Sequence, residues 1–358
     1  MGSNSKVWGN ISTPEAMNVG ANFAHVTGNI QSGGVLTLGD RAIADKNITS
    51  SGASTIGDHA TVGGNMISGG VLTTGDTSKV SGYVASGGAA TVGANAKVVG
   101  TVSAVGKITI SASATTGTVL PPLSASPVNP VAYKDALVNR VVADSALVSK
   151  AQDALRNMTH DSAASFGLNF YGGTIASVLL APTMTVDTTL ISGVYHAASW
   201  STTAGKKLTL DGKGVTNAAW VFNITDILAF GGVTTMELIN APGTPSVIWN
   251  AFNGYTSTGK GAHVIGTILA KTYVMVGAEA TVDGANTTVG GKLACGGIYS
   301  ATSYVSTGDS AVIDGRGCVA ETTTPAEAAA VVPEPGSLAM LLTGLGLLGF
   351  MVRRKNQA

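Results

Sequence analysis

The chain has 358 residues, of which 48 are glycine, 44% are hydrophobic and only 11% are charged. Its basic and acidic residues cancel, and no cluster of Lys or Arg occurs before residue 353, which argues against a nucleic-acid partner. Abundant glycine without a collagen period, in a chain this apolar, predicts an ordered all-β protein rather than a disordered one.

An N-terminal segment, residues 1–20, precedes a sequence repeat. Its first ten residues, MGSNSKVWGN, contain no apolar stretch like that of a secretory signal peptide. In residues 21–118 a nine-residue motif returns every 18 positions, as SGGVLTLGD, SSGASTIGD, SGGVLTTGD, SGGAATVGA and, more weakly, AVGKITISA. A short fixed period rich in glycine predicts a β-solenoid with three short strands in each coil.

Alternation within the motif predicts which side chains face outward. Apolar residues flank a central threonine, and side chains two apart in a strand share a face. The apolar columns should therefore line the interior, and the threonines should form one outward column: Thr37, Thr55, Thr73, Thr91 and Thr109. This ladder is a candidate binding surface, although threonine also favours exposed strand positions with no function attached.

Glycine and aspartate columns end the motif. Glycine is predicted to turn each corner with a positive φ angle. The glycines are Gly39, Gly57, Gly75 and Gly93. The aspartates that follow them are interpreted as local turn caps, because their spacing differs from that of the Gly-Gly-x-Gly-x-Asp calcium repeats. They are Asp40, Asp58 and Asp76, and the fourth copy has Ala94. No metal ion is expected.

A proline-rich connection, residues 119–130, leads to the one clearly predicted helix, residues 131–158. One face of this helix is apolar at helical spacing and should pack along the solenoid. It comprises Leu137, Val141, Val148, Ala151 and Leu155. Less regularly spaced β segments follow, and they predict a second solenoid in residues 159–318.

Short motifs in residues 132–305 occur in the order GVY, LTLDG, VFNI, VIWN, ATVDG and KLA. In this order they resemble the ice-binding-like domain of microbial antifreeze proteins. The resemblance implies a triangular β-helix flanked by one long α-helix, with the N-terminal coils extending the solenoid. It also implies a flat face with Thr-x-Thr-like pairs on successive coils, interrupted here by Lys271 and Tyr273. The candidates are Thr256, Thr258 and Thr272, with Thr287 and Thr288 beyond them.

The C-terminus carries the most specific linear motif. After a linker, residues 319–332, the tail of residues 333–358 contains Pro333-Glu334-Pro335, an apolar run of 17 residues and the basic cluster Arg353-Arg354-Lys355. It resembles the PEP-CTERM sorting signal of Gram-negative bacteria. The resemblance implies a hydrophobic C-terminal helix that enters the membrane transiently, a sorting protease as partner, and export to the outer surface. In that oxidising compartment Cys295 and Cys318 are expected to form a disulfide.

These features predict an exported ice-binding protein that adsorbs through a flat threonine-rich face. Threonines two apart in a strand stand about 6.6–7 Å apart and coils repeat at about 4.8 Å, which gives a lattice of hydroxyl and methyl groups near the spacing of ice. The alternative is a cell-surface or extracellular-matrix adhesin associated with exopolysaccharide.

An enzyme is not expected, and neither is a cofactor. The histidines are scattered without metal-ligand spacing, at His25, His59, His160, His196 and His263. The acidic residues of the second half do not recur at a coil period that would gather them in a groove, as polysaccharide cleavage requires.

Overall fold

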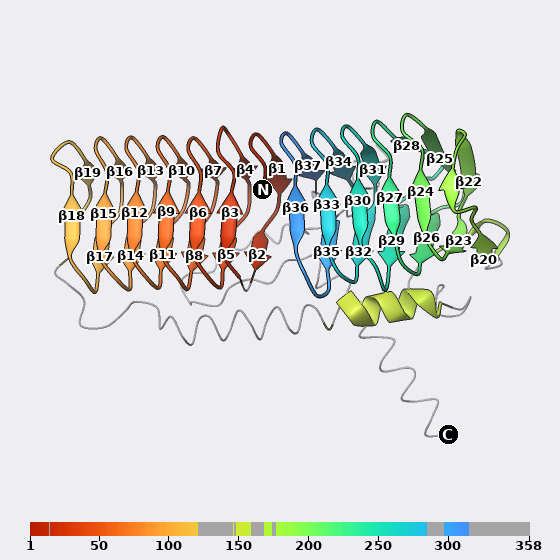
Figure 1. Ribbon diagram of the computed structural model, residues 1–358, viewed down its shortest axis with the longest axis horizontal. Coiled ribbons are helices and arrows are strands. Elements are labelled where there is room, and N and C mark those ends of the chain that lie inside the picture. The colour runs from red at the N-terminus through yellow and green to blue at the C-terminus, as the bar shows by residue number, and fades with distance from the viewer. Residues whose placement is uncertain are drawn as a thin grey trace, which may run out of the picture. The chain divides into compact units, whose positions relative to one another are not determined.

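The structure is a computed structural model that describes residues 1–13, 15–120, 146, 148–158, 168–173, 177–284 and 297–314. The chain divides into two compact units, Met1–Asp144 with Ser306–Val312, and Ser145–Val305 with Ile313–Ala358. In each unit the strands of one sheet come from successive coils and run parallel (Figure 1). Both units are therefore β-solenoids, which confirms the predicted fold class.

Three parallel sheets surround the core of the first unit. The first sheet contains β1 (Lys6–Trp8), β4 (His25–Val26), β7 (Ile43–Ala44), β10 (Thr61–Val62), β13 (Lys79–Val80), β16 (Lys97–Val98) and β19 (Thr115–Thr116). The second contains β2 (Ile11–Thr13), β5 (Ile30–Ser32), β8 (Ile48–Ser50), β11 (Met66–Ser68), β14 (Val84–Ser86) and β17 (Val102–Ala104). The third contains β3 (Met17–Val19), β6 (Leu36–Leu38), β9 (Ser54–Ile56), β12 (Leu72–Thr74), β15 (Ala90–Val92) and β18 (Ile108–Ile110).

Inward columns of small and medium apolar side chains fill this unit. Ile30 pairs with Ile48 and Met66 with Val84, and all four side chains are fully buried. This predicted apolar column thus lines the core.

The structure corrects the predicted boundary between residues 1–20 and 21–118. Strands β1–β3 form a first coil within residues 1–20, where the nine-residue motif is absent. Ile11 pairs with Ile30, 19 residues on, so this coil is one residue longer than the others. Residues 306–312 also belong to the first unit, because Ser310 N–H donates to the carbonyl of Ser3 at 2.8 Å.

The second unit has longer and less regular coils. One sheet contains β20 (Ser177–Leu179), β23 (Gly193–Ala197), β26 (Ala219–Ile224), β29 (Ser246–Ala251), β32 (Thr267–Ala270) and β35 (Gly297–Ser300). Another contains β21 (Thr183–Met184), β24 (Trp200–Thr202), β27 (Leu228–Phe230), β30 (Thr256–Thr258) and β33 (Val274–Val276). A third side is formed by β22 (Thr188–Ile191), β25 (Lys207–Asp211) and β28 (Thr235–Ile239), and by the pair β31 (His263–Ile265) and β34 (Thr281–Asp283). The last strands are β36 (Val305–Thr307) and β37 (Val312–Asp314), and a short 3₁₀ turn spans Tyr171–Gly173.

Aromatic side chains fill the wider core of the second unit. Phe222 and Trp249 stack with ring centroids 3.9 Å apart, and Trp200 stacks on Trp249 at 5.8 Å. Phe230 meets Trp249 edge to face at 5.0 Å. Both of these geometries are favourable for aromatic pairs, so the large rings stabilise coils that small side chains would leave hollow.

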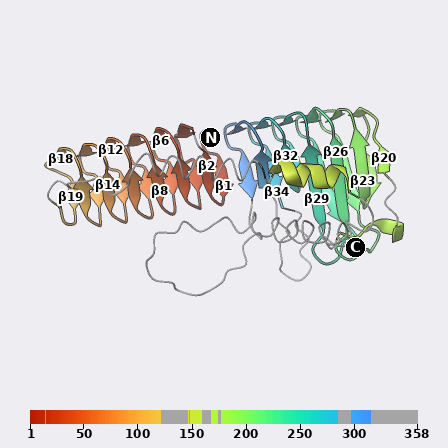
Figure 2. The same ribbon diagram turned by 90° about the horizontal axis from the view of Figure 1, so that it is seen from below.

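The helix of residues 148–156 packs on the outside of the β20–β35 sheet (Figure 2). Val148, Ala151 and Leu155 are buried against Val194 and Leu269, so this part of the predicted apolar face is confirmed. The rest of the predicted helix, with Leu137 and Val141, lies outside the described residues.

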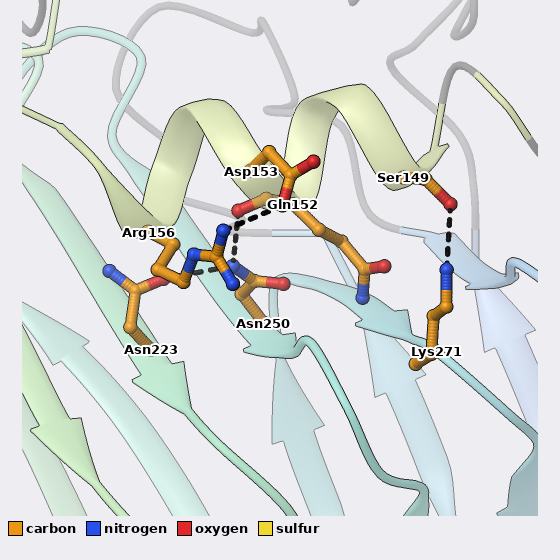
Figure 3. A network of polar contacts seen from close by, with 7 residues as sticks. All are labelled: Ser149, Gln152, Asp153, Arg156, Asn223, Asn250 and Lys271. Atoms are coloured by element: carbon orange, nitrogen blue, oxygen red, sulfur yellow. Dashed lines mark hydrogen bonds and ion pairs between the residues drawn. The ribbon is translucent and has the colours of Figure 1, made fainter.

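Buried polar groups fix the position of the helix on the sheet (Figure 3). Asn250 Nδ2 donates to the carbonyl of Gln152 at 3.1 Å and to Oδ1 of Asn223 at 2.9 Å. Asn223 Nδ2 donates to the carbonyl of Leu155 at 2.9 Å. Because these amides are buried, each lost hydrogen bond would leave an unpaired polar group, and the helix therefore has one preferred position.

Candidate binding surface

The five predicted threonines form a single outward ladder on the third sheet of the first unit, one in each of β6, β9, β12, β15 and β18. Figure 1 shows these strands side by side. They pair in register along successive coils, in the order Thr37, Thr55, Thr73, Thr91 and Thr109. The residues on either side point into the core, as Leu36 and Leu38 do beside Thr37. Each threonine side chain is half-buried or exposed.

The hydroxyl groups of this ladder are free for an external partner. Within the described part of the chain, none of the five donates a hydrogen bond to another protein group or accepts one. A hydroxyl carries one donor and two acceptor positions, so each remains able to bind water or a ligand.

A second outward column stands two residues before the threonines and alternates valine with alanine: Val35, Ala53, Val71 and Ala89. Val35 and Val71 are 50% and 48% exposed. Sequence reasoning missed this column, although its position two residues before threonine in the first four copies of the motif was a sufficient signal; the fifth copy has Lys107 there. We call residues 35–39, 53–57, 71–75 and 89–93 together the threonine face; none of them is charged.

Glycine occupies the far edge of the threonine face because neighbouring coils approach closely there. The prediction of a positive φ angle at these glycines is wrong. Positive φ angles of 56–59° occur two residues later, at Arg41, His59, Thr77 and Asn95. A Cβ atom at Gly75 would lie 2.7 Å from the carbonyl carbon of Gly57, and one at Gly93 would lie 2.7 Å from that of Gly75. Such distances leave no room for a side chain.

The aspartates connect one coil to the next, so their interpretation as local turn caps is also wrong. The backbone N–H of Asp58 donates to Oδ1 of Asp40 at 3.0 Å, that of Asp76 to Asp58 at 2.8 Å, and that of Ala94 to Asp76 at 2.7 Å. Asparagines repeat this arrangement at another corner, where Asn65 N–H donates to Oδ1 of Asn47 at 2.8 Å. Among the described residues, no three His, Cys, Asp or Glu side chains gather as metal ligands would.

Buried serines hold the near edge of the threonine face. Ser68 Oγ donates to the carbonyl of Gly52 at 2.8 Å, and Ser86 Oγ to that of Gly70 at 2.7 Å. Backbone hydrogen bonds between coils continue beside them, for example from Leu72 N–H to the carbonyl of Ala89 at 2.9 Å. Both edges of the face are thus tied from coil to coil, which keeps it rigid and lowers the entropy lost on binding.

The candidate threonines of the second unit do not form an outward pair. Thr256 is fully buried and Thr258 is 6% exposed, so both point into the core. Thr256 pairs with Leu228 and Thr258 with Phe230, and these apolar partners show that the outward residue is Ser257. Thr272 is half-buried and lies just before β33, so the structure does not bring the three together on one face. Thr287 and Thr288 lie outside the described residues.

The matching face of the second unit is less uniform than the threonine face. Its outward column contains Thr183, Ser201, Ala229, Ser257 and Met275. Thr183 and Ser201 hydrogen-bond to each other at 3.1 Å. Beside this column three tyrosines stack, with centroids 4.7 Å apart for Tyr255 and Tyr273 and 5.5 Å apart for Tyr273 and Tyr304. Burial and the neighbouring tyrosines raise the pKa of Tyr273. We call this surface the serine–tyrosine face.

Parts of the other outward surfaces are buried or carry charge. In the first unit the outward residues Gln31, Ala85 and Ser103 of the second sheet are less than 9% exposed. In the second unit ion pairs mark the third side, including Lys213 Nζ with Asp211 Oδ2 at 2.7 Å.

Several predicted sites lie outside the described residues. These are Cys295 and Cys318, the linker of residues 319–332, and the tail with Pro333, Glu334, Pro335, Arg353 and Arg354. The described residues contain no helical segment with the length and hydrophobicity of a membrane span.

The first unit is thus a stacked β-solenoid with one uncharged face that bears a column of hydroxyl groups. Residues 131–292 match the Ice-binding-like family, and residues 331–355 match the PEP-CTERM protein-sorting motif. The first match includes most of the second unit, and the second indicates a signal for export and sorting to the cell envelope. The sequence resemblances are confirmed by both matches.

Three solved structures with similarity to this chain are described as ice-binding proteins. One is from the Antarctic ascomycete Antarctomyces psychrotrophicus, with 21% identity, a TM-score of 0.37, and coverage of 69% of this chain and 94% of that one. Another is from an Arctic yeast, with 19% identity, a TM-score of 0.33, and coverage of 70% and 94%. A third is from an Antarctic bacterium of the Flavobacteriaceae, with 13% identity, a TM-score of 0.30, and coverage of 87% and 80%. No curated protein matches the sequence significantly.

Proposed function

We propose that this protein is exported and binds ice through the threonine face. The observation that carries the proposal is the register of the four outward threonines of this face, continued by Thr109, whose hydroxyl groups bind no other described protein group. The ice-binding-like domain of residues 131–292 supports ice as the partner. The threonine face lies outside that domain, in residues 35–93, so the proposal assigns binding to the regular repeat.

Physically, adsorption to ice needs many weak contacts held in fixed positions. Hydroxyl groups repeat at about 4.8 Å along the solenoid, and outward columns within a strand are about 6.6–7 Å apart. Inter-coil hydrogen bonds hold these positions before binding, so the entropy lost on contact is small. The four segments that make up the threonine face contain no charged residue, which avoids the cost of desolvating ions there.

Substitution on each face tests the assignment. Thr55→Tyr with Thr73→Tyr should abolish thermal hysteresis and inhibition of ice recrystallisation, because two large side chains would hold the flat surface away from ice. The matched control is Thr61→Tyr with Thr115→Tyr, two outward positions on the first sheet of the same unit. If Ala229→Tyr with Ser257→Tyr abolishes activity instead, the serine–tyrosine face is the ice-binding surface.

Export through the C-terminal tail is the second part of the proposal. The match to the sorting motif at residues 331–355 supports it. Deletion of residues 333–358 should change where the protein is found and leave the circular dichroism spectrum and the unfolding temperature unchanged. A truncated protein that misfolds would show that the tail is part of the fold and that the proposed boundary is wrong.

An adhesin that binds exopolysaccharide is the alternative, and the stacked tyrosines favour it. Tyrosine combines apolar surface with a hydroxyl group, and Tyr304 is 54% exposed. Under this alternative, Tyr273→Ala with Tyr304→Ala should abolish retention on immobilised exopolysaccharide, and the wild-type protein should show no ice activity.

A further inference from the structure

The alternating column beside the threonines is part of the same surface. Val35 stands two residues before Thr37 and Val71 two residues before Thr73, so each pair shares the outward side of one strand. The column is in register from coil to coil, because Leu36 N–H donates to the carbonyl of Ala53 at 2.9 Å and Ser54 N–H to that of Val71 at 2.8 Å.

The two valines are not needed for the core. Inward positions of the same coils hold fully buried side chains such as Leu36 and Leu72, whereas Val35 and Val71 leave about half of their surface in water. Isolated exposed apolar residues are common on proteins. Here they stand at the same position in two alternate coils of the threonine face, with alanine in the coil after each; the following coil has the exposed Lys107 at this position.

This alternation gives the face a second spacing. Threonine groups repeat in every coil, at about 4.8 Å, and the valine side chains repeat in every second coil, at about 9.6 Å. A partner that contacts both columns at once must itself be rigid and periodic in two directions. A crystal surface meets that condition, and a flexible polysaccharide chain does not.

We propose that the alternating column of Val35, Ala53, Val71 and Ala89 is the second rank of the ice-binding surface and determines which plane of ice the threonine face selects. This inference rests on the proposed function. The threonines supply hydroxyl and methyl groups at every coil, the valines enter hollows of the ice surface at every second coil, and the alanines leave room for the ridges between them.

The test compares two opposite double variants of the full chain, labelled with a fluorophore and adsorbed to a single ice crystal. Val35→Ala with Val71→Ala removes the two larger side chains of the column. We expect about tenfold weaker adsorption, because methyl contacts with ice are lost. Ala53→Val with Ala89→Val replaces the small side chains of the column with larger ones. We expect the fluorescent protein to mark a different ice plane or none. Val35→Thr with Val71→Thr keeps the shape, and we expect it to keep the plane.

The outcomes separate this inference from the proposed function. Suppose that Thr55→Tyr with Thr73→Tyr abolishes adsorption. If the Val→Ala and Ala→Val double variants then bind the same plane as the wild type with equal strength, only the inference about the alternating column is overturned. If the wild-type protein does not adsorb, or adsorbs equally well with the two tyrosines present, both are overturned. All exchanged residues are exposed or half-buried; unchanged unfolding temperatures would show that the variants are folded.

Discussion

The two solenoid units hold their coils together by different means. In the first unit the paired strands from His25 to Thr116 repeat every 18 residues. The same kinds of contact recur between coils: buried serines, Asn and Asp side chains that accept from the next coil, and glycines where coils touch. In the second unit Val194 pairs with Val221 and Val221 with Ile248, 27 residues apart, whereas Ile248 pairs with Thr267, 19 residues on. In the second unit, stacked aromatic rings and a covering helix stabilise the coils in place of the repeated side-chain contacts of the first unit.

The difference shows what regularity provides. A regular coil presents identical outward positions at a constant rise, so a flat face follows from the backbone alone. An irregular coil brings different residues to each outward position, as the column from Thr183 to Met275 does. The unit that carries the family match therefore has the more varied surface, and the unit outside the match has the more uniform one.

The largest effect is expected where a side chain is forced between coils of the first unit. Gly75→Val should lower the free energy of unfolding of this unit by about 3 kcal/mol or more, because its Cβ would lie 2.7 Å from the backbone of Gly57. Thermal unfolding followed by circular dichroism measures this. Gly193→Ala in the second unit is the control, since its nearest contact would be an ordinary 3.7 Å, to the ring of Tyr195. Equal stability of the two variants would contradict close stacking as the reason for the glycine column.

A smaller loss is expected from the buried amides that position the helix in the second unit. Asn250→Ala removes hydrogen bonds to the Gln152 carbonyl and to Asn223 Oδ1 and leaves both acceptors buried, which should cost about 2–4 kcal/mol. Chemical denaturation reports the change. Asp153→Ala on the same helix breaks only an exposed ion pair with Arg156, 3.2 Å long, and should cost less than about 1 kcal/mol. The assignment fails if the two variants are equally stable.

The aspartate ladder of the first unit should contribute less per residue. Asp58→Ala removes the acceptor for Asp76 N–H and should destabilise the unit by about 1 kcal/mol. Asp58→Asn keeps an oxygen at that position, as Asn47 and Asn65 do at the other corner, and should stay within about 0.5 kcal/mol of the wild type. A loss in the asparagine variant as large as in the alanine variant would show that the charge, and not the hydrogen bond, matters.

The smallest effect concerns acid. Hydrogen bonds from the side chain and backbone of Lys213 and from Asn240 lower the pKa of Asp211 from 3.8 to about 2. A carboxyl group whose pKa is lowered in the folded state stabilises that state above its ordinary pKa, and the contribution is lost as the pH falls from about 3.8 through about 2. The unfolding temperature of the wild type should therefore fall more steeply in this range than that of Asp211→Asn. Parallel curves for the two proteins would contradict the role of Asp211.

The regular half of the fold was predictable from sequence because its period is constant. Alternation around Thr73 places Leu72 inside and threonine outside, and register then follows for every copy. The first coil was not predictable from the motif, because residues 13–21 lack it and the step to the next coil is 19. The role of Gly75 was misjudged for a physical reason: close approach between coils is a property of stacking, which a local dihedral argument does not include.

In the second unit, the prediction of an outward threonine pair depended on which positions of β30 face outward. A Thr-x-Thr pattern predicts two threonines on one face, but period-2 alternation leaves open which face that is. Thr256 and Thr258 point inward because Leu228 and Phe230 beside them do. This orientation becomes clear only when β27 and β30 are aligned. Leu228 and Thr256 are 28 residues apart, so the 18-residue period of the first unit does not give the alignment.

The constant 18-residue coil also has a consequence for how such a protein changes over generations. A tandem duplication of one copy in the gene adds a whole number of codons, and a deletion removes them, so the reading frame is kept. The coils that become neighbours make the same contacts as before. Each such event lengthens or shortens the first unit by one row of outward residues without requiring compensating substitutions. The same event in the second unit would separate Trp200, Phe222 and Trp249, which stack across coils, and would be selected against. The area of the threonine face can thus change by one coil in a single genetic event.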